Sequence, residues 1–317
     1  MKAVSLFFGW MYTAAMLVSC QGNEASSQDK SLVLQSPNGR VVLHAYLDDR
    51  SNMCYRVDRD GQVVIERSSL GFEFAHNRPA LSWGQFAVRM HGPDTVIQDY
   101  KLPWGEDPQL HSESIRGQVD LLGPHDYSWS VEFQVTNDRI AFRTHFPEHP
   151  AHDTIWIAEE HSEINLAGGP MSWWIPGDDD NCEHLHQTLQ LNETEVLANW
   201  DSTSIFCTHG VSNAVNTPVT FRWDDGMHAA IHETALADYP VMTLIVDTAR
   251  GLLKTELVGG PHPWKAKVHG PFSTPWRIIL LADDTVGLAN SRKTLHLNPL
   301  QTEYPLEQNE ACVQPMK

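Results

Sequence analysis

The sequence predicts an all-β fold, one large β-sandwich. The first observation is the alternation of apolar and polar side chains over residues 127–136, which is the pattern of a half-buried strand. The second is a series of Gly-containing turn dipeptides next to short apolar runs. The third is that no long stretch beyond the first twenty residues repeats its apolar side chains every 3.6 residues. Many short strands separated by tight turns are typical of a sandwich.

The N-terminal residues are expected to precede the sandwich. Lys2 is followed by an apolar run over residues 3–18 that is too short to span a bilayer comfortably and is typical of a signal peptide. Small and apolar residues then lead into Cys20, a pattern similar to the bacterial lipobox. We therefore predict a lipoprotein signal peptide over residues 1–19, lipidation of Cys20, and a polar tether over residues 20–31. The other interpretation is a plain secretory signal that ends next to a cysteine.

These segments predict an exported protein that is lipid-anchored to a bacterial membrane and faces the periplasm, with the outer membrane as the expected location. Contact with the membrane is expected only through the lipid anchor. The chain of 317 residues has 40 acidic and 22 basic residues, and its formal net charge is -18. Because such a surface repels phosphate backbones, the sequence predicts no binding to nucleic acid.

Turn signals place the strands along the chain. Residues 127–136 and 140–146 both alternate, and Asn137 and Asp138 between them predict an antiparallel hairpin. Three further dipeptides that accept the positive φ angles of tight turns are Asn38-Gly39, Asp60-Gly61 and Asp225-Gly226.

Four cysteines remain beyond the predicted lipidation site, and none has the spacing of a zinc site. They are Cys54, Cys182, Cys207 and Cys312. Disulfides and buried free thiols are both compatible with an exported protein, and the spacing does not identify a pair.

Several segments together resemble one known family. They are residues 34–39 (LQSPNG), 140–143 (IAFR), 216–220 (NTPVT), 231–240 (IHETALADYP), 272–277 (FSTPWR) and 295–299 (LHLNP). Their order and spacing are similar to those of the N-terminal domain of glycoside hydrolase family 97, a bacterial α-glucosidase and α-galactosidase family. The resemblance implies a galactose-mutarotase-like β-supersandwich over residues 32–300, closed by a strand over residues 295–299. Residues 301–317 are expected to form a weakly ordered tail.

The family resemblance also implies a (β/α)₈ barrel that carries the catalytic carboxylates and follows the sandwich. A barrel of that type needs about 250 residues, and 18 residues follow Pro299 in this sequence of 317 residues. We therefore expect a non-catalytic, carbohydrate-associated domain that binds α-linked glycans. The alternative is one part of a calcium-dependent α-glucosidase or α-galactosidase that is active only with a separately encoded barrel.

Glu233 is the one residue to which the resemblance assigns a part in the family's active site. In the family the matching glutamate provides one calcium ligand, and barrel residues supply the others. Calcium takes about 6–8 oxygen ligands, so binding is expected only if a barrel completes the site. Otherwise we expect Glu233 to be solvated or paired with a nearby base.

Trp173 and Trp174 are candidates for stacking against a sugar ring. They precede the acidic run of residues 178–180, which could form the rim of such a site. The other interpretation is a solvated loop beside a core aromatic residue, because charged runs usually stay in water.

A mutarotase-like sandwich also suggests an epimerase that uses a histidine acid and a glutamate base. His232 and Glu233 are adjacent, so in a strand their side chains would point to opposite faces and could not share a substrate. His184 and His186 would share a face if their segment were extended. No Gly-rich phosphate loop or nucleophile elbow occurs in the sequence.

Overall fold

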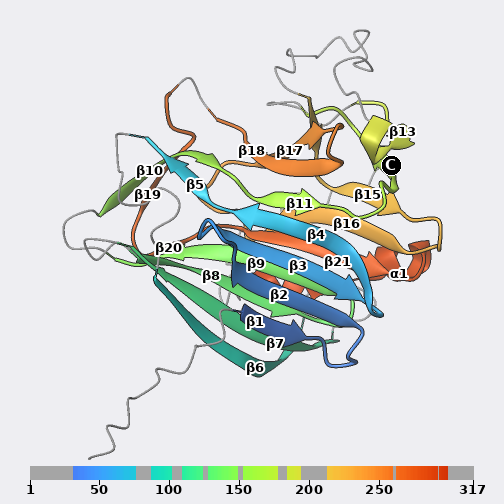
Figure 1. Ribbon diagram of the computed structural model, residues 1–317, viewed down its shortest axis with the longest axis horizontal. Helices are drawn as coiled ribbons and strands as arrows, with labels where there is room; N and C mark the ends of the chain where they lie inside the picture. The colour runs from blue at the N-terminus through green and yellow to red at the C-terminus, as the bar shows by residue number, and fades with distance from the viewer. Residues whose placement is uncertain are drawn as a thin grey trace, which may run out of the picture.

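The computed structural model describes residues 31–75, 87–101, 109–123, 128–148, 153–177, 184–193, 213–259, 262–291 and 293–298. Within these ranges the chain is built almost entirely of antiparallel strands arranged in facing layers (Figure 1). The predicted fold class, an all-β antiparallel supersandwich, is therefore confirmed. None of the helices in these ranges is long and apolar enough to cross a membrane.

The largest layer is a ten-stranded sheet. Nine strands follow one another in the order β13-β12-β15-β16-β21-β9-β8-β7-β6, and β20 pairs with β9. Their bounds are β6 (Ala87–Lys101), β7 (Gln109–Leu122), β8 (Ser128–Val135), β9 (Arg139–Phe146), β12 (Met171–Trp174), β13 (Gln187–Gln190), β15 (Val219–Arg222), β16 (His228–Thr234), β20 (Phe272–Ser273) and β21 (Trp276–Ala282).

Two four-stranded sheets lie opposite this layer. The first is a meander of β1 (Ser31–Gln35), β2 (Val41–Leu47), β3 (Met53–Arg59) and β4 (Gln62–Leu70). The second has the order β11-β18-β17-β14, with β11 (Glu163–Asn165), β14 (Ala214–Asn216), β17 (Met242–Asp247) and β18 (Leu252–Leu257). An isolated bridge between Ile65 and Leu166 joins the two sheets side by side (Figure 1).

A three-stranded sheet and three short helices complete the described residues. The sheet has the order β19-β10-β5, with β5 (Phe72–Phe74), β10 (Thr154–Glu160) and β19 (Ala266–His269). The helices are η3 (Leu191–Glu193), α1 (Thr285–Ala289) and η4 (Lys293–Leu297).

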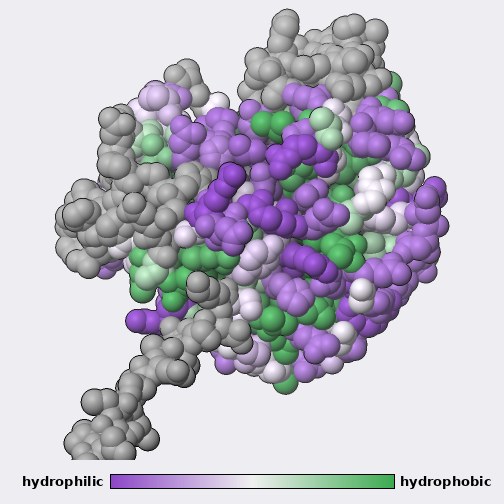
Figure 2. Space-filling model, in the orientation of Figure 1, coloured by the Kyte–Doolittle hydropathy of each residue, from purple (hydrophilic) through white to green (hydrophobic). Residues whose placement is uncertain are grey.

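The main core fills the space between the layers. Tyr55 on β3 is fully buried, and its ring centroid lies 5.3 Å from that of Phe142 on β9 and 6.4 Å from that of Phe133 on β8. The outward side of the β1–β4 sheet is largely hydrophilic, with hydrophobic residues in small separate groups (Figure 2). Burial of one face of each sheet therefore holds the layers together.

The predicted hairpins are present. β8 and β9 pair antiparallel with Val135 opposite Ile140, as the alternation indicated. Gly39, Gly61 and Gly226 all have positive φ angles in the turns where the dipeptides predicted them.

Two expectations are wrong in detail. The polar face of β8 was expected to meet solvent, but Ser130 and Gln134 on that face are buried; β8 lies between β7 and β9 in the ten-stranded sheet. Residues 295–299 were expected to form a closing strand, but the segment Lys293–Leu297 is the 3₁₀ helix η4. Leu297 packs on Trp276 and Ile278 on the outer side of the ten-stranded sheet, so side-chain burial rather than strand pairing fixes this segment.

Candidate functional site

Glu233 lies in a buried ion network at one end of the sandwich. It is the sixth residue of β16 and stands directly opposite Arg277, the second residue of β21. Glu160, the last residue of β10, approaches Arg277 from the neighbouring sheet. All three side chains are buried, and the exposed fraction of Arg277 is 1%.

Arg277 divides its hydrogen bonds between the two carboxylates. Its Nε donates to Oε1 of Glu160 at 2.9 Å, and its Nη2 donates to Oε2 of Glu160 at 2.6 Å. Its Nη1 donates to Oε2 of Glu233. The guanidinium therefore forms a bidentate ion pair with Glu160 and a single hydrogen bond to Glu233. Bidentate arginine–carboxylate pairs are stronger than single hydrogen bonds.

Neutral donors complete the hydrogen bonds of the two carboxylates. The backbone N–H of Met242 donates to Oε1 of Glu233 at 2.9 Å. The hydroxyls of Ser162 and Tyr239 donate to Glu160 at 2.9 and 3.2 Å. Each oxygen of both carboxylates thus accepts at least one hydrogen bond, as buried charge requires.

The pKa values of the two carboxyls move in opposite directions. Burial raises the pKa of Glu233 above its ordinary value, and the charge of Arg277 and the N–H of Met242 only partly oppose this. Burial acts in the same direction on Glu160, but the charge and hydrogen bonds of Arg277 outweigh it and lower the pKa of that carboxyl. Burial alone would lower the pKa of Arg277, yet the two carboxylates raise it, so the guanidinium stays charged.

In this arrangement the carboxylate of Glu233 is not available as a calcium ligand. Both of its oxygens accept hydrogen bonds, and a guanidinium cation occupies the position next to it. Among the described residues, no group of three or more His, Cys, Asp or Glu side chains is arranged to hold a metal ion. The expectation that Glu233 would pair with a nearby base is confirmed, and that base is Arg277.

His232 and Glu233 lie on opposite faces of β16, as predicted. Glu233 faces the interior, whereas His232 is exposed on the outer side, where its Nδ1 lies 3.3 Å from Oγ1 of Thr217. His184 and His186 precede β13 instead of lying in a strand, and His184 is buried while His186 is exposed. The extended segment that would place these two histidines on one face is therefore not formed.

The two tryptophans of β12 have different surroundings. Trp174 is 1% exposed and belongs to the main core, so its ring cannot stack on a sugar that arrives from solvent. Trp173 is half-buried, and the guanidinium of Arg222 lies 5.6 Å from its ring centroid. Alternation along the strand turns only one of the two rings inward. Residues 178–180 lie outside the described residues.

Cys54 is buried as a free thiol, and burial raises its pKa to about 12. Cys20, Cys182, Cys207 and Cys312 lie outside the described residues, as do the predicted signal peptide, residues 20–30 of the tether and residues 301–317.

Sequence reasoning missed the partners of Glu233. Arg277 entered only as the last residue of the family-resembling segment 272–277, and Glu160 was not singled out. The available signal was a charged residue directly beside the apolar run Ile278–Ile279 in a strand, because such a residue must be paired when it faces a core.

The architecture defines an antiparallel β-supersandwich domain with a buried carboxylate–guanidinium network at one end. The chain belongs to the family described as glycosyl-hydrolase 97 N-terminal, which matches residues 34–299. The family resemblance read from the sequence is thereby confirmed.

Solved structures agree with this assignment. A glycoside hydrolase family 97 enzyme from Pseudoalteromonas sp. strain K8, in complex with acarbose, is 27% identical with a TM-score of 0.70, and the match covers 84% of this chain and 38% of that one. A variant of that enzyme in complex with panose gives the same identity, coverage and TM-score. A β-arabinopyranosidase shares the fold at 17% identity and a TM-score of 0.64, over 80% of this chain and 40% of its own. The chain thus spans well under half the length of these enzymes.

Proposed function

We propose that this chain is a non-catalytic, carbohydrate-binding domain that recognises α-linked glycans. The observation that carries the proposal is the placement of Glu233. The family resemblance implies an active-site part for this residue alone, yet its carboxylate is buried and bound by Arg277 and by the N–H of Met242. A carboxylate held in this way is withdrawn from metal binding and from acid–base chemistry.

The carbohydrate part of the proposal is supported by the relatives. The Pseudoalteromonas enzyme was solved with acarbose and, as a variant, with panose. The matched region of that enzyme corresponds to most of this chain, so a role in handling related oligosaccharides is the natural extension to this protein.

A second candidate is one part of a calcium-dependent α-glucosidase or α-galactosidase that works with a barrel. The match covers 38% of the Pseudoalteromonas enzyme. It favours the second candidate, because in that enzyme the matched region works as one part of a longer chain. In this case a barrel packed at the Glu233 end would have to draw the carboxylate away from Arg277 before it could bind calcium.

The test combines binding and hydrolysis. The full-length chain, purified in detergent, is titrated with panose by calorimetry and is assayed with aryl α-glucoside and α-galactoside in the presence of calcium. The proposal predicts heat of binding and no release of the aryl group. Hydrolysis would contradict a non-catalytic role and support the second candidate, and absence of panose binding would overturn the carbohydrate role.

We also propose that the protein is exported and held by lipid on Cys20 at a bacterial membrane, facing the periplasm. Metabolic labelling with a radioactive fatty acid tests this location. The wild-type chain should take up label, Cys20→Ser should not, and the matched control Cys312→Ser should label as the wild type does. If both variants take up label as the wild type does, the lipid is attached elsewhere. If neither variant takes up label and the wild type does not either, the chain carries no lipid.

A further inference from the structure

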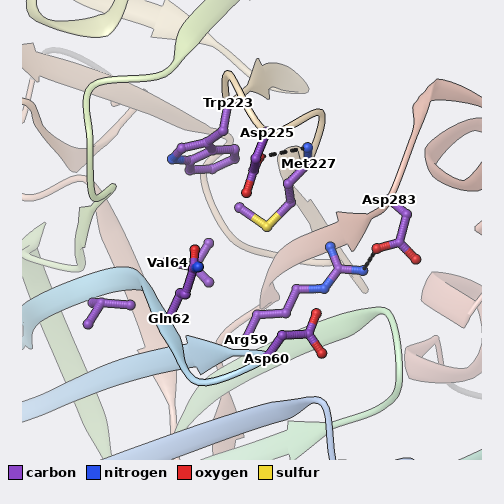
Figure 3. Close-up of a pocket in the computed structure, with 9 residues that line it drawn as sticks. Arg59, Asp60, Gln62, Val64, Trp223, Asp225, Met227 and Asp283 are labelled. Atoms are coloured by element: carbon purple, nitrogen blue, oxygen red, sulfur yellow. Dashed lines mark hydrogen bonds and ion pairs between the residues drawn. The ribbon is translucent and has the colours of Figure 1, made fainter.

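A second polar site lies at the opposite end of the same strands. The cavity has a volume of about 310 Å³ and is formed by the β3–β4 turn, the β15–β16 turn and the end of β21 (Figure 3). Met227 and Glu233 are six residues apart along the chain, so about 20 Å of strand separates the cavity from the Glu233 end. The cavity contains none of the residues that the sequence singled out as candidates for catalysis, metal binding or sugar stacking.

One wall of the cavity is apolar. Trp223 and Met227, both half-buried, come from the β15–β16 turn and face Val64 and Gln62 of β4 across the cavity (Figure 3). The Nε1 of Trp223 donates to the carbonyl of Ala167 at 2.7 Å, which fixes the orientation of the ring. An indole held in place in this way offers a rigid surface to an incoming ring.

The other walls carry polar groups. The hydrogen bonds of the described residues leave the side chain of Gln62 and one oxygen of Asp225 unused, while the second oxygen of Asp225 accepts from the N–H of Met227 at 3.0 Å. Gln62 can donate and accept, and the free oxygen of Asp225 can accept. Both side chains are exposed and can reach a ligand.

Arg59 is the buried polar group of this site. Its side chain is 5% exposed, and its Nη2 donates to Oδ1 of Asp283 at 2.8 Å (Figure 3). Its Nε and Nη1 are buried and have no hydrogen-bond partner among the described residues. Buried donors without an acceptor are costly and rare in folded proteins, so this guanidinium points to an acceptor that the described part of the chain does not supply.

The charges of the cavity indicate a neutral ligand. Asp60, Asp225 and Asp283 place three carboxylates around it. Arg40 offsets two of them, since its Nη2 lies 2.8 Å from both Asp60 and Asp283 and ties the two segments together. With Arg59 the walls still carry more negative than positive charge, which disfavours a phosphate or carboxylate ligand.

We infer that this cavity binds a single neutral sugar ring, such as the terminal unit of an α-linked glycan. The apolar face of the ring packs on Trp223, and its hydroxyls bond to Asp225, Gln62 and, after a small movement of the guanidinium toward the cavity, Arg59. The volume is at the lower end of the range of small-ligand sites, about 300–1,000 Å³. The inference rests on the proposed function and locates the glycan on the molecule.

The test uses the full-length chain and panose, with binding measured by calorimetry and by tryptophan fluorescence. Gln62→Ala and Asp225→Asn alter exposed side chains and should each weaken panose binding by about tenfold, the effect of removing one ligand hydrogen bond. Asp224→Asn is the matched control, because it removes the same charge from the same turn but outside the cavity. It should leave the affinity within about twofold of wild type. Unchanged melting temperatures confirm that the variants are folded.

The outcomes separate this inference from the proposed function. If wild type binds panose and the two cavity variants bind it equally well, the cavity is not the site, while the glycan-binding function stands. Loss of binding only in Trp173→Ala would likewise exclude the cavity and would place the sugar on β12. If wild type binds no neutral glycan, both proposals fail. Preference for glucuronate over panose would overturn the assignment of a neutral ligand.

Discussion

Arg277 is a permanent cation inside the core, and its environment explains why it is tolerated there. Two carboxylates, a backbone N–H and two hydroxyls are arranged around it so that the charged groups are all paired. Networks of this kind are most sensitive to the loss of one partner, which leaves an uncompensated charge in a medium of low polarity.

The two glutamates of this network should contribute unequally to stability. Glu160→Gln removes the bidentate partner of Arg277 and should lower the free energy of unfolding by about 3 kcal/mol. Glu233→Gln leaves that pair intact and should cost about 1 kcal/mol. Denaturant unfolding measures both, with exposed Glu66→Gln on β4 as a control that changes stability by less than about 0.5 kcal/mol. Equal losses for the two buried positions would contradict the arrangement described.

The opposite pKa shifts predict opposite pH dependence. Because the pKa of Glu233 is raised in the folded state, the folded chain holds this proton more tightly, so protonation stabilises wild type relative to Glu233→Gln as pH falls through the raised pKa toward the ordinary glutamate pKa of about 4.3. The lowered pKa of Glu160 acts the other way, and its advantage over Glu160→Gln is lost as pH falls below the ordinary glutamate pKa of about 4.3. Unfolding curves of the three proteins between pH 7 and pH 3 would show the stability difference between wild type and Glu233→Gln growing as pH falls, and the difference between wild type and Glu160→Gln shrinking.

At the scale of elements, the close approach of β1 to β7 depends on one position without a side chain. A Cβ atom at Gly117 would lie 2.8 Å from Cδ2 of Leu32 and 2.8 Å from Cδ2 of Leu34. Any side chain at residue 117 would therefore force the Leu32 and Leu34 side chains to shift, so glycine allows the layers their present close packing.

Overpacking at this position should loosen the sandwich. Gly117→Val should lower the free energy of unfolding by about 1–3 kcal/mol, because the added methyl groups meet Leu32 and Leu34. Adding Leu32→Ala to Gly117→Val should recover part of that loss, even though Leu32→Ala alone is destabilising. Strict additivity of the two single losses would show that the contact is not the cause.

At the scale of the whole molecule, the two sites lie at opposite ends of one sandwich. The Glu233 end contains a closed ion network, whereas the Arg59 end contains an open cavity with unused polar groups. The first is built for stability, and the second has the composition of a binding site.

Calcium should therefore have little effect on the isolated chain. Because both oxygens of Glu233 are engaged, millimolar calcium should shift the melting temperature by less than about 1 °C. Scanning calorimetry with calcium and with magnesium as the matched control measures this directly. A large rise that calcium alone produces, and that Glu233→Gln abolishes, would show that the carboxylate leaves Arg277 to bind the metal.

Period-two alternation and Gly-containing turns are local properties of the chain, so they predicted the β8–β9 hairpin and the turns at Gly39, Gly61 and Gly226 correctly. The same alternation placed His232 and Glu233 on opposite faces. The short segments that resemble glycoside hydrolase family 97 lie in the region that the family model matches, residues 34–299.

Tertiary structure alone decided which of these faces are buried and what they meet. Glu160 and Arg277 are 117 residues apart, and only the packing of β10 beside β21 brings them together. Arg59 and Asp283 are 224 residues apart, and the cavity beside them exists because the β3–β4 turn, the β15–β16 turn and the end of β21 meet at the same edge. Local pattern determines strands and turns through short-range sterics, whereas a site made of distant side chains depends on how whole layers pack.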